Sequence, residues 1–258
     1  MAIKAAFFDI DGTLVGFKDD KIRLSVIDVL ERARRNGVGL YISSGRPKAL
    51  MNNLRDFPFD GYIMMNGALV KIGEEVIYSN PIPRESALAL VDIAARRDIA
   101  AIAFLENGLG LSFENEVTAM INDLLHVGPF PTVDLPALVR DNDVYEFTVY
   151  GTEEQIASLQ DYVPGVIFPR WHPRFCDAVP ENVSKAAAIQ RTCEYLGLDN
   201  DEVVVFGDGG NDIPMLSWAH NAVVMGNATD EVKAYASFVT KDVDDDGIEY
   251  AMKMLGLI

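Results

Sequence analysis

Three short stretches of the chain are almost entirely apolar, and they predict buried β-strands. They are residues 3–8, 38–43 and 203–206. Apolar runs of this length are typical of parallel strands that are covered on both faces. After the first run, the apolar positions of residues 22–33 recur with helical spacing, which predicts an amphipathic helix that ends at Gly37.

The chain continues as alternating strands and helices up to about residue 81. A helix over residues 47–54, with proline at an early helical position, is expected after the second strand. A short strand over residues 62–65 follows, and residues 69–72 and 75–78 form a predicted hairpin. Strand–helix alternation of this kind is typical of a parallel sheet with helices on its faces.

The pattern changes between residues 82 and 183. Helices are predicted over residues 85–97, 116–125 and 153–159, and strands over 99–105, 109–113, 144–150, 166–168 and 175–179. The strand over residues 144–150 alternates in polarity, as a strand with one exposed face would. The prolines between Pro129 and Pro136 mark a loop. These features predict an α+β segment with antiparallel strands.

From residue 184 onwards the first pattern returns. Helices are predicted over residues 184–196, from 213, and over 230–236 and 247–255, with strands over 203–206, 222–225 and 238–240. We therefore expect an α/β fold whose core is a Rossmann-like doubly wound parallel sheet made of residues 1–81 and 184–258. Residues 82–183 would form an inserted α+β cap domain.

The composition narrows the classes of partner. The 258 residues include 39 Asp and Glu against 22 Lys and Arg, a net charge of −17. Such a charge argues against a nucleic-acid backbone or an anionic membrane as partner. A phosphorylated small molecule stays compatible, because a metal ion and a few local cations reverse the field in a cleft. Two cysteines, Cys176 and Cys193, indicate reduced thiols, and the lack of a signal-like or membrane-spanning apolar stretch predicts the cytoplasm.

Two acidic residues follow the first predicted strand, at a position where burying their charges would cost free energy. Asp9 comes directly after the strand and Asp11 two positions later, with Gly12 and Thr13 starting a turn. Neighbouring carboxylates in a low-dielectric crevice repel, so one of them is driven towards protonation. A Mg²⁺ ion bound by their oxygens would remove that cost, and the two acids would then act as nucleophile and proton donor. The simpler alternative is an Asp-Gly turn with a capping acid.

Polar residues also follow other predicted strands, at the edge where parallel sheets bind ligands. They are Ser44, Gly45 and Arg46 after the second strand, Lys185 near a helix start, and Asp208, Asn211 and Asp212 after residue 206. Taken singly, Ser44 is explained by helix capping, Lys185 by a solvated surface and Asp208 by a turn. Together, these interpretations would require Asp9, Asp11 and Asp208 to lie at the same edge of a buried sheet by chance. A functional site at this edge explains their positions better.

These residues resemble, in chain order, the four motifs of the haloacid dehalogenase superfamily, in the variant of its Cof-type phosphatase branch. The matching stretches are FDIDGTL at 8–14, SSGRP at 43–47, VSK at 183–185 and GDGGNDIPML at 207–216. The stretches NGA at 66–68, MGNA at 225–228 and DGI at 246–248 are also similar to that branch. The resemblance covers the predicted core and is weak in the cap.

The resemblance implies a role for each matching residue. Asp9 would be the nucleophile that takes the phosphoryl group as an aspartyl phosphate, and Asp11 the general acid and then base. Ser44 would hydrogen-bond the phosphoryl group, and Lys185 would neutralise charge on Asp9 and the phosphoryl oxygens. The implied Mg²⁺ ligands are Asp9, Asp11 through its backbone carbonyl, and Asp208, with Asn211 and Asp212 in support; the implied phosphate-binding residues are Gly45, Arg46, Asn66 and Asn211.

The leading hypothesis is a Mg²⁺-dependent phosphatase of small phosphorylated metabolites, with sugar phosphates among the candidates. A phosphomutase that uses the same aspartyl phosphate is the alternative. A phospho-accepting signalling module of the receiver type is disfavoured by the large segment between Asp9 and Lys185. Trp171, His172 and Arg174, just before the return to the core, are candidate substrate contacts or else packing and surface residues. The sequence specifies neither the substrate nor an oligomeric state.

Overall fold

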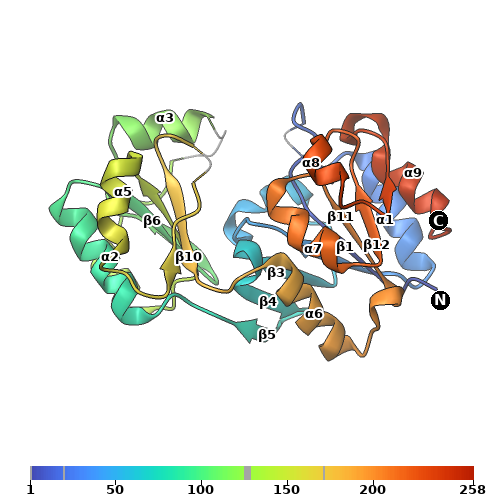
Figure 1. The fold of residues 1–258 in the computed structure, drawn as a ribbon, viewed down its shortest axis with the longest axis horizontal. Coiled ribbons are helices and arrows are strands. Elements are labelled where there is room, and N and C mark those ends of the chain that lie inside the picture. The colour runs from blue at the N-terminus through green and yellow to red at the C-terminus, as the bar shows by residue number, and fades with distance from the viewer. Residues whose placement is uncertain (1, 20, 125–128, 171) are drawn as a thin grey trace. The chain divides into compact units, whose positions relative to one another are not determined.

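The chain divides into two compact units, which are described separately (Figure 1). A computed structural model describes residues 2–19, 21–124, 129–170 and 172–258. Unit 1 consists of Met1–Arg46, Leu50–Ser79 and Ser184–Ile258, and unit 2 of Pro47–Ala49 and Asn80–Val183. Unit 1 is therefore built from both ends of the chain.

Unit 1 is organised around a mostly parallel sheet. Its strand order is β13 (Phe238–Val239), β12 (Asn221–Val224), β11 (Val203–Gly207), β1 (Ala5–Phe8), β2 (Gly39–Ser43), β3 (Gly61–Met64), β4 (Leu69–Ile72) and β5 (Glu75–Ser79). The strands from β13 to β3 run parallel, and β4 and β5 add an antiparallel hairpin at one edge. The doubly wound parallel core that the sequence predicts is confirmed.

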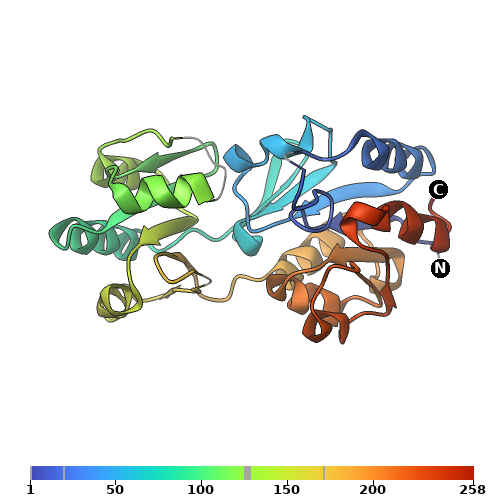
Figure 2. The same ribbon diagram turned by 90° about the horizontal axis from the view of Figure 1, so that it is seen from above.

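Both faces of this sheet are buried, which explains why its central strands are apolar without alternation. All four residues of β1 are buried, with Phe7 stacked on Tyr41 and Phe8, on the opposite face, stacked on Phe206. Figure 2 shows helices on both sides of the sheet. One side carries α1 (Leu24–Arg35) and α9 (Gly247–Met254), and the other α6 (Lys185–Leu196) and α7 (Ile213–Trp218); the short α8 (Asp230–Lys233) links β12 to β13.

The helix predicted over residues 47–54 is wrong. The segment forms two separate 3₁₀ turns, Lys48–Leu50 and Asn52–Leu54. The Leu50 carbonyl, which a continuing helix would use, accepts a hydrogen bond from the Arg46 guanidinium at 2.9 Å. A side chain from outside the segment thus competes with the helical hydrogen bonds, and the chain turns instead.

Unit 2 contains an antiparallel sheet, and three of its helices contribute to the hydrophobic cluster on the sheet. The strand order is β7 (Gly108–Leu111), β6 (Ala100–Leu105), β8 (Glu146–Tyr150), β10 (Cys176–Pro180) and β9 (Val166–Ile167). The helices are α2 (Arg84–Arg96), α3 (Glu116–Leu124), α4 (Leu135–Asp141) and α5 (Glu153–Gln160). Residues of α2, α4 and α5 share one hydrophobic cluster with alternate residues of β6, β8 and β10. The predicted α+β character of the inserted segment is confirmed.

The proline-marked loop is confirmed over residues 129–134. The helix α4, which the sequence pattern did not predict, begins at Leu135, where Asp134 caps it by accepting a hydrogen bond from the Ala137 N–H and Pro136 fits the first turn. One expectation for unit 2 is wrong. The strand over residues 144–150 is not half-exposed. It is the central strand β8, in which Phe147 and Val149 are fully buried and Glu146 is buried as well.

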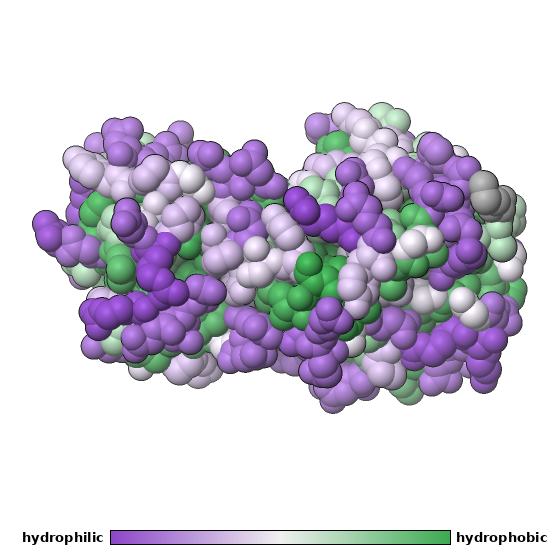
Figure 3. All heavy atoms as spheres, turned by 90° about the horizontal axis from the view of Figure 1, so that it is seen from below, coloured by the Kyte–Doolittle hydropathy of each residue, from purple (hydrophilic) through white to green (hydrophobic). Residues whose placement is uncertain are grey.

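The surface of both units is largely hydrophilic on the face drawn in Figure 3, in keeping with the net charge of −17. Cys176 and Cys193 are both free and buried. Among the described residues, no helix combines the length and the apolar character needed to span a membrane.

Burial of Glu146 predicts a pH-dependent stability. Burial raises the pKa of this carboxyl well above the ordinary value of 4.5, and the nearby Asp177 raises it further. The folded protein therefore binds this proton more tightly than the unfolded chain, so the stability contributed by Glu146 falls as the pH rises above 4.5.

Glu146→Gln is expected to reduce the loss of stability between about pH 5 and about pH 8, because the amide cannot ionise. Thermal midpoints of the wild type and the variant at the two pH values measure the effect. Glu114→Gln, at an exposed position of the same unit, is the matched control and should leave the pH dependence unchanged. Parallel pH profiles for wild type and Glu146→Gln would contradict the assignment.

Candidate active site

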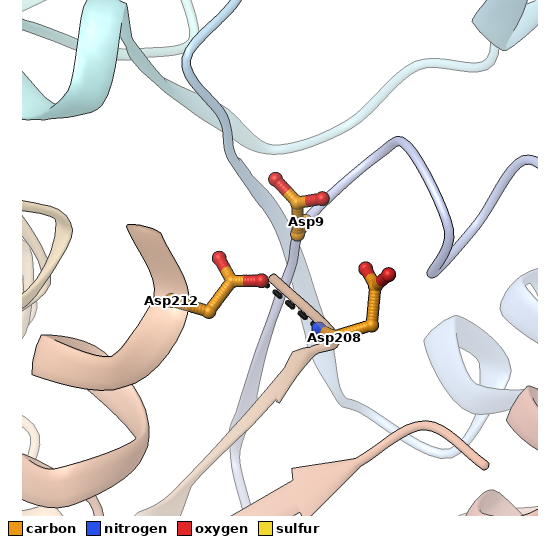
Figure 4. A group of neighbouring side chains, drawn as sticks. All are labelled: Asp9, Asp208 and Asp212. Carbon is orange, nitrogen blue, oxygen red and sulfur yellow. Dashed lines mark hydrogen bonds between the residues drawn. The ribbon is translucent and has the colours of Figure 1, made fainter. Parts of the chain in front are cut away.

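Parallel pairing brings two of the predicted acids to one edge of the sheet. Asp9 directly follows β1, and Asp208 directly follows β11. The two strands are parallel neighbours with Phe8 opposite Phe206, so they end side by side. Figure 4 shows Asp9, Asp208 and Asp212 grouped at this edge, with Asp212 at the start of the helix that follows β11.

The turn after β1 is shaped to let the Asp208 carboxylate approach. Gly12 has a φ of +80°, and a Cβ at this position would lie 2.1 Å from Asp208 Oδ2. Only glycine combines this backbone conformation with such an approach at low cost. The next residue, Thr13, donates its hydroxyl hydrogen to Asp208 Oδ1 at 3.0 Å. The predicted turn of Asp11, Gly12 and Thr13 therefore positions the Asp208 carboxylate, which lies 195 residues after Thr13 in the chain.

Lys185 is held at the same edge by the start of α6. Ser184 caps that helix by accepting a hydrogen bond from the Ala187 N–H at 3.1 Å. Gly67, with a φ of +105°, lets the Ser184 carbonyl approach so closely that a Cβ would lie 2.5 Å from it. The Lys185 side chain is fully buried, and its Nζ lies 2.5 Å from Asp9 Oδ1 and 2.6 Å from Asp212 Oδ1. The surface alternative for Lys185 is wrong.

Asp212 braces the loop after β11. Its Oδ1 accepts the Lys185 hydrogen bond, and its Oδ2 accepts hydrogen bonds from the backbone N–H groups of Asp208 and Gly209, each at 2.9 Å. Gly207 is required next to it, because a Cβ there would lie 2.7 Å from the Asp212 carboxyl. Asp212 Oδ1 is thus paired with the Lys185 ammonium, and Oδ2 accepts two backbone hydrogen bonds, which suits a supporting residue better than a ligand.

The donor set fits a divalent cation. Asp9, Asp208 and Asp212 each offer an oxygen, and these oxygens lie within 4.8 Å of one another. Lys185 supplies one positive charge against three carboxylates, and Mg²⁺ prefers oxygen ligands. Because Asp212 Oδ2 accepts two backbone hydrogen bonds and its Oδ1 faces Lys185, Asp9 and Asp208 are the better candidate ligands.

The site carries an excess of negative potential. Burial raises the pKa of Asp9 to about 8; Lys185 opposes this rise and Asp212 adds to it. Burial also raises the pKa of Asp208 to about 6, with a further rise from Asp212 that the Thr13 hydrogen bond opposes. For Lys185, burial lowers the pKa, but the attraction of Asp212 and Asp9 outweighs it and the pKa is raised. All three pKa shifts indicate that an additional positive charge, from a proton or a cation, would stabilise this cluster of three carboxylates and one lysine.

Asp11, the predicted acid and base, lies outside this carboxylate group. Its Oδ2 and Oδ1 accept hydrogen bonds from the Arg46 Nε and terminal nitrogen at 2.6 and 2.9 Å. The Asp11 side chain is 45% exposed, in contrast to the buried Asp9. Arg46, which the sequence suggests as a phosphate-binding residue, is therefore engaged with a carboxylate and with the Leu50 carbonyl.

The remaining predicted residues gather at the ends of β2 and β3. Ser44 is buried, and its Oγ accepts a hydrogen bond from the Arg46 N–H at 3.1 Å. Asn66 adopts a left-handed backbone with a φ of 54°, donates its N–H to the Ser44 carbonyl, and accepts a hydrogen bond from Asn211 Nδ2 at 3.3 Å. Gly45 leaves room for the Asn66 amide, since a Cβ would lie 3.2 Å from it.

The candidate substrate contacts of the cap belong to unit 2. The His172 ring stacks on Phe175 with 4.9 Å between centroids, and its Nδ1 accepts a hydrogen bond from the Arg174 N–H. Trp171 lies outside the described residues. Substrate contact by these three residues stays a prediction.

One residue in contact with the site received no role from the sequence. Asn227 donates hydrogen bonds from Nδ2 to the Gly12 carbonyl and to Asp208 Oδ2. The available signal was its position just after β12, at the same edge of the parallel sheet as Asp9 and Asp208. An asparagine in such a place is ambiguous in sequence, because it suits an ordinary turn equally well.

Comparison with known proteins identifies the family. A family model for haloacid dehalogenase-like hydrolases matches residues 6–252. The chain is 32% identical to YkrA of Bacillus subtilis, over the full length of both chains. It is also similar to the solved structure of BT4131, described as a sugar phosphatase of haloacid dehalogenase subclass IIB, at 40% identity and a TM-score of 0.84, with 99% of this chain and 100% of that chain covered.

A second solved structure, from work on a trigonal-bipyramidal intermediate in a phosphoryl-transfer superfamily, is 39% identical with a TM-score of 0.85, covering 99% of this chain and 100% of that chain. The chain therefore belongs to the haloacid dehalogenase-like hydrolases, as its motifs predict. Within that family it is a phosphatase.

Lys185→Met is expected to destabilise the folded protein by about 3–5 kcal/mol, because it leaves two buried acids without their cation. Urea unfolding measures the loss. Lys253→Met is the matched control, since the Lys253 pair with Glu249 at 2.6 Å is on the surface, with a 55% exposed lysine, and should cost less than about 1 kcal/mol. Similar losses for the two variants would contradict a buried charge pair that organises the site.

Proposed function

We propose that this protein is a Mg²⁺-dependent phosphatase that hydrolyses small phosphorylated metabolites, sugar phosphates among them, through an aspartyl phosphate on Asp9. The observation that carries the proposal is the buried Lys185 ammonium, 2.5 Å from Asp9 and 2.6 Å from Asp212, with the Asp208 carboxylate in the same group. Phosphoryl transfer needs mainly positioning and positive charge around the transferring group, and this arrangement suits both needs.

In the first step, Asp9 attacks the phosphorus atom. Its Oδ1 accepts the Lys185 hydrogen bond, so Oδ2 is the oxygen we assign to the attack. A bond forms between Oδ2 and phosphorus as the bond from phosphorus to the ester oxygen breaks. The leaving oxygen takes a proton from the Asp11 carboxyl, for which Asp11 exchanges one Arg46 hydrogen bond for the leaving group.

In the second step, water hydrolyses the aspartyl phosphate. The Asp11 carboxylate accepts a proton from the water as its oxygen bonds to phosphorus, and the bond from phosphorus to Asp9 breaks. Inorganic phosphate leaves, and both acids return to their starting states. Lys185 stays beside Asp9 throughout, where its charge stabilises the extra negative charge of each transition state.

Asp9 and Asp208 are the side chains that would hold Mg²⁺, with the backbone carbonyl of Asp11 as a third ligand. When bound, the ion supplies positive charge that neutralises the phosphoryl oxygens. Asp212 supports this pair through the backbone N–H groups of the Asp208 loop.

Ser44, Gly45 and Arg46, together with Asn66 and Asn211, are proposed to bind the oxygens of the transferring phosphoryl group. Their supporting observation is that Asn66 contacts both the Ser44 carbonyl and the Asn211 amide, so the five residues line one stretch of the strand ends. Hydroxyl, amide and backbone N–H groups are suitable donors to phosphate oxygens.

The proposed substrates are small esters, for two reasons. The net charge of −17 disfavours polyanionic nucleic acid, and the similar protein BT4131 is described as a sugar phosphatase. We assign catalysis to residues 1–81 and 184–258 and leaving-group selection to the cap of residues 82–183. The expected location of such a metabolic phosphatase is the cytoplasm.

A panel of phosphate esters that includes sugar phosphates, assayed for inorganic phosphate with Mg²⁺ and with excess chelator, tests the function. The wild type should release phosphate from small esters only with Mg²⁺, and Asp9→Asn should abolish release because an amide is a poor nucleophile. Asp28→Asn, at an exposed position of α1, is the control and should stay active. Isomerised ester without phosphate release would indicate a mutase, and activity in chelator would exclude the metal requirement.

Asp11→Asn should slow phosphoenzyme formation from alkyl phosphates by roughly 10²–10⁴-fold, because the leaving alkoxide then lacks its proton donor. The loss in this step should be much smaller for an aryl phosphate, whose leaving group needs no proton. Single-turnover kinetics with the two ester types measure the difference. Equal losses for alkyl and aryl esters would count against Asp11 as the leaving-group acid.

A further inference from the structure

The short segment after β12 is fixed in place against two other loops. The Met225 N–H donates to the Gly207 carbonyl at 3.0 Å, and the Gly226 N–H donates to the Lys241 carbonyl at 2.9 Å. A Cβ at Gly226 would lie 2.5 Å from the Asp242 nitrogen, so only glycine allows this packing. The next residue, Asn227, therefore starts from a well-defined backbone position.

The Asn227 side chain joins three loops that are remote in sequence. Its Nδ2 donates to the Gly12 carbonyl at 2.9 Å and to Asp208 Oδ2 at 3.1 Å. Its Oδ1 accepts a hydrogen bond from the Val243 N–H at 3.0 Å. That last contact settles the orientation of the amide, because only the oxygen can accept from a backbone N–H. The nitrogen is thereby directed at the Asp208 carboxylate.

Asp208 is held by two neutral donors, one on each oxygen. Thr13 donates to Oδ1 at 3.0 Å, and Asn227 donates to Oδ2. Neutral donors orient a carboxylate without cancelling its charge, and each oxygen keeps a second lone pair for a cation. Asp212 contrasts with this, because its oxygens are taken by the Lys185 ammonium and two backbone N–H groups.

We propose that Asn227 is a positioning residue that holds the Asp208 carboxylate, together with the Gly12 turn, in the geometry that binds Mg²⁺. The inference rests on the proposed function, in which Asp208 is a ligand of the ion. Hydrogen bonds of this kind to metal ligands typically affect metal affinity by about 10–100-fold. Asn227→Ala should therefore weaken Mg²⁺ binding by that factor.

A purely structural role for Asn227 makes a different prediction. An asparagine that only closes loops would, when replaced, lower the thermal midpoint and leave the Mg²⁺ affinity of the folded protein unchanged. Metal affinity of the resting protein, without substrate, is thus the measurement that separates the two roles.

Isothermal titration of Mg²⁺ into the full-length protein, with Asn227→Ala, Asn221→Ala and Asp208→Ala, provides the test. Asn221 is a matched control at the start of β12, whose other end precedes Asn227; its Nδ2 donates to the Val203 and Asp201 carbonyls at 2.9 and 3.4 Å. We expect Asp208→Ala to lose binding, Asn227→Ala to bind about 10–100-fold more weakly, and Asn221→Ala to bind like the wild type.

Should Asn227→Ala fail to fold, Asn227→Ser carries the test, because its hydroxyl is too short to make all three contacts. Wild-type affinity in the folded Asn227 variant, or equal weakening by Asn221→Ala, would overturn the role of Asn227 while leaving the metal site intact. Absence of Mg²⁺ binding by the wild type, or full binding by Asp208→Ala, would overturn the proposed metal site and this inference with it.

Discussion

The buried ammonium of Lys185, placed between Asp9 and Asp212, is the contact on which the rest of the site depends. A desolvated lysine is costly unless it has carboxylate partners, and desolvated carboxylates need a cation in turn. The three charges come from the end of β1, the start of α6 and the loop after β11. These three parts of the chain must therefore meet at one place, which couples the position of the candidate catalytic groups to the packing of the whole core.

Negative charges outnumber positive ones in this cluster, and the excess of negative charge suits the binding of a cation. Three carboxylates face one lysine. Burial raises the pKa values of Asp9 and Asp208, Asp212 raises them further, and Lys185 only partly opposes the rise. A divalent cation would relieve this excess of negative charge. Thr13 and Asn227 donate neutral hydrogen bonds to Asp208, so they orient its carboxylate without reducing the excess of negative charge. This edge of the core therefore offers oxygen ligands that fit a divalent cation.

The expectations that failed are those in which a side-chain contact or the packing of neighbouring elements changed a local pattern. Residues 47–54 have a helical pattern, but the Arg46 side chain takes the Leu50 carbonyl and the segment becomes two 3₁₀ turns. The β8 strand has the alternation of a half-exposed strand, but neighbouring strands and the packing of unit 2 bury both its faces, including Glu146. Local periodicity reports what a segment can bury, and the surrounding packing decides what it does bury.

The sequence by itself determined the strands of the core, the inserted α+β segment and the family, because apolar runs and short motifs are local and survive without tertiary context. It also placed Asp9 and Asp208 at strand ends, where parallel pairing brings them together. Only the tertiary structure decided that Arg46 holds Asp11 and that Asn227 holds Asp208 and Gly12. Asn227 and Gly12 are 215 residues apart, and a hydrogen bond over that separation follows from how the loops pack, which no local pattern encodes.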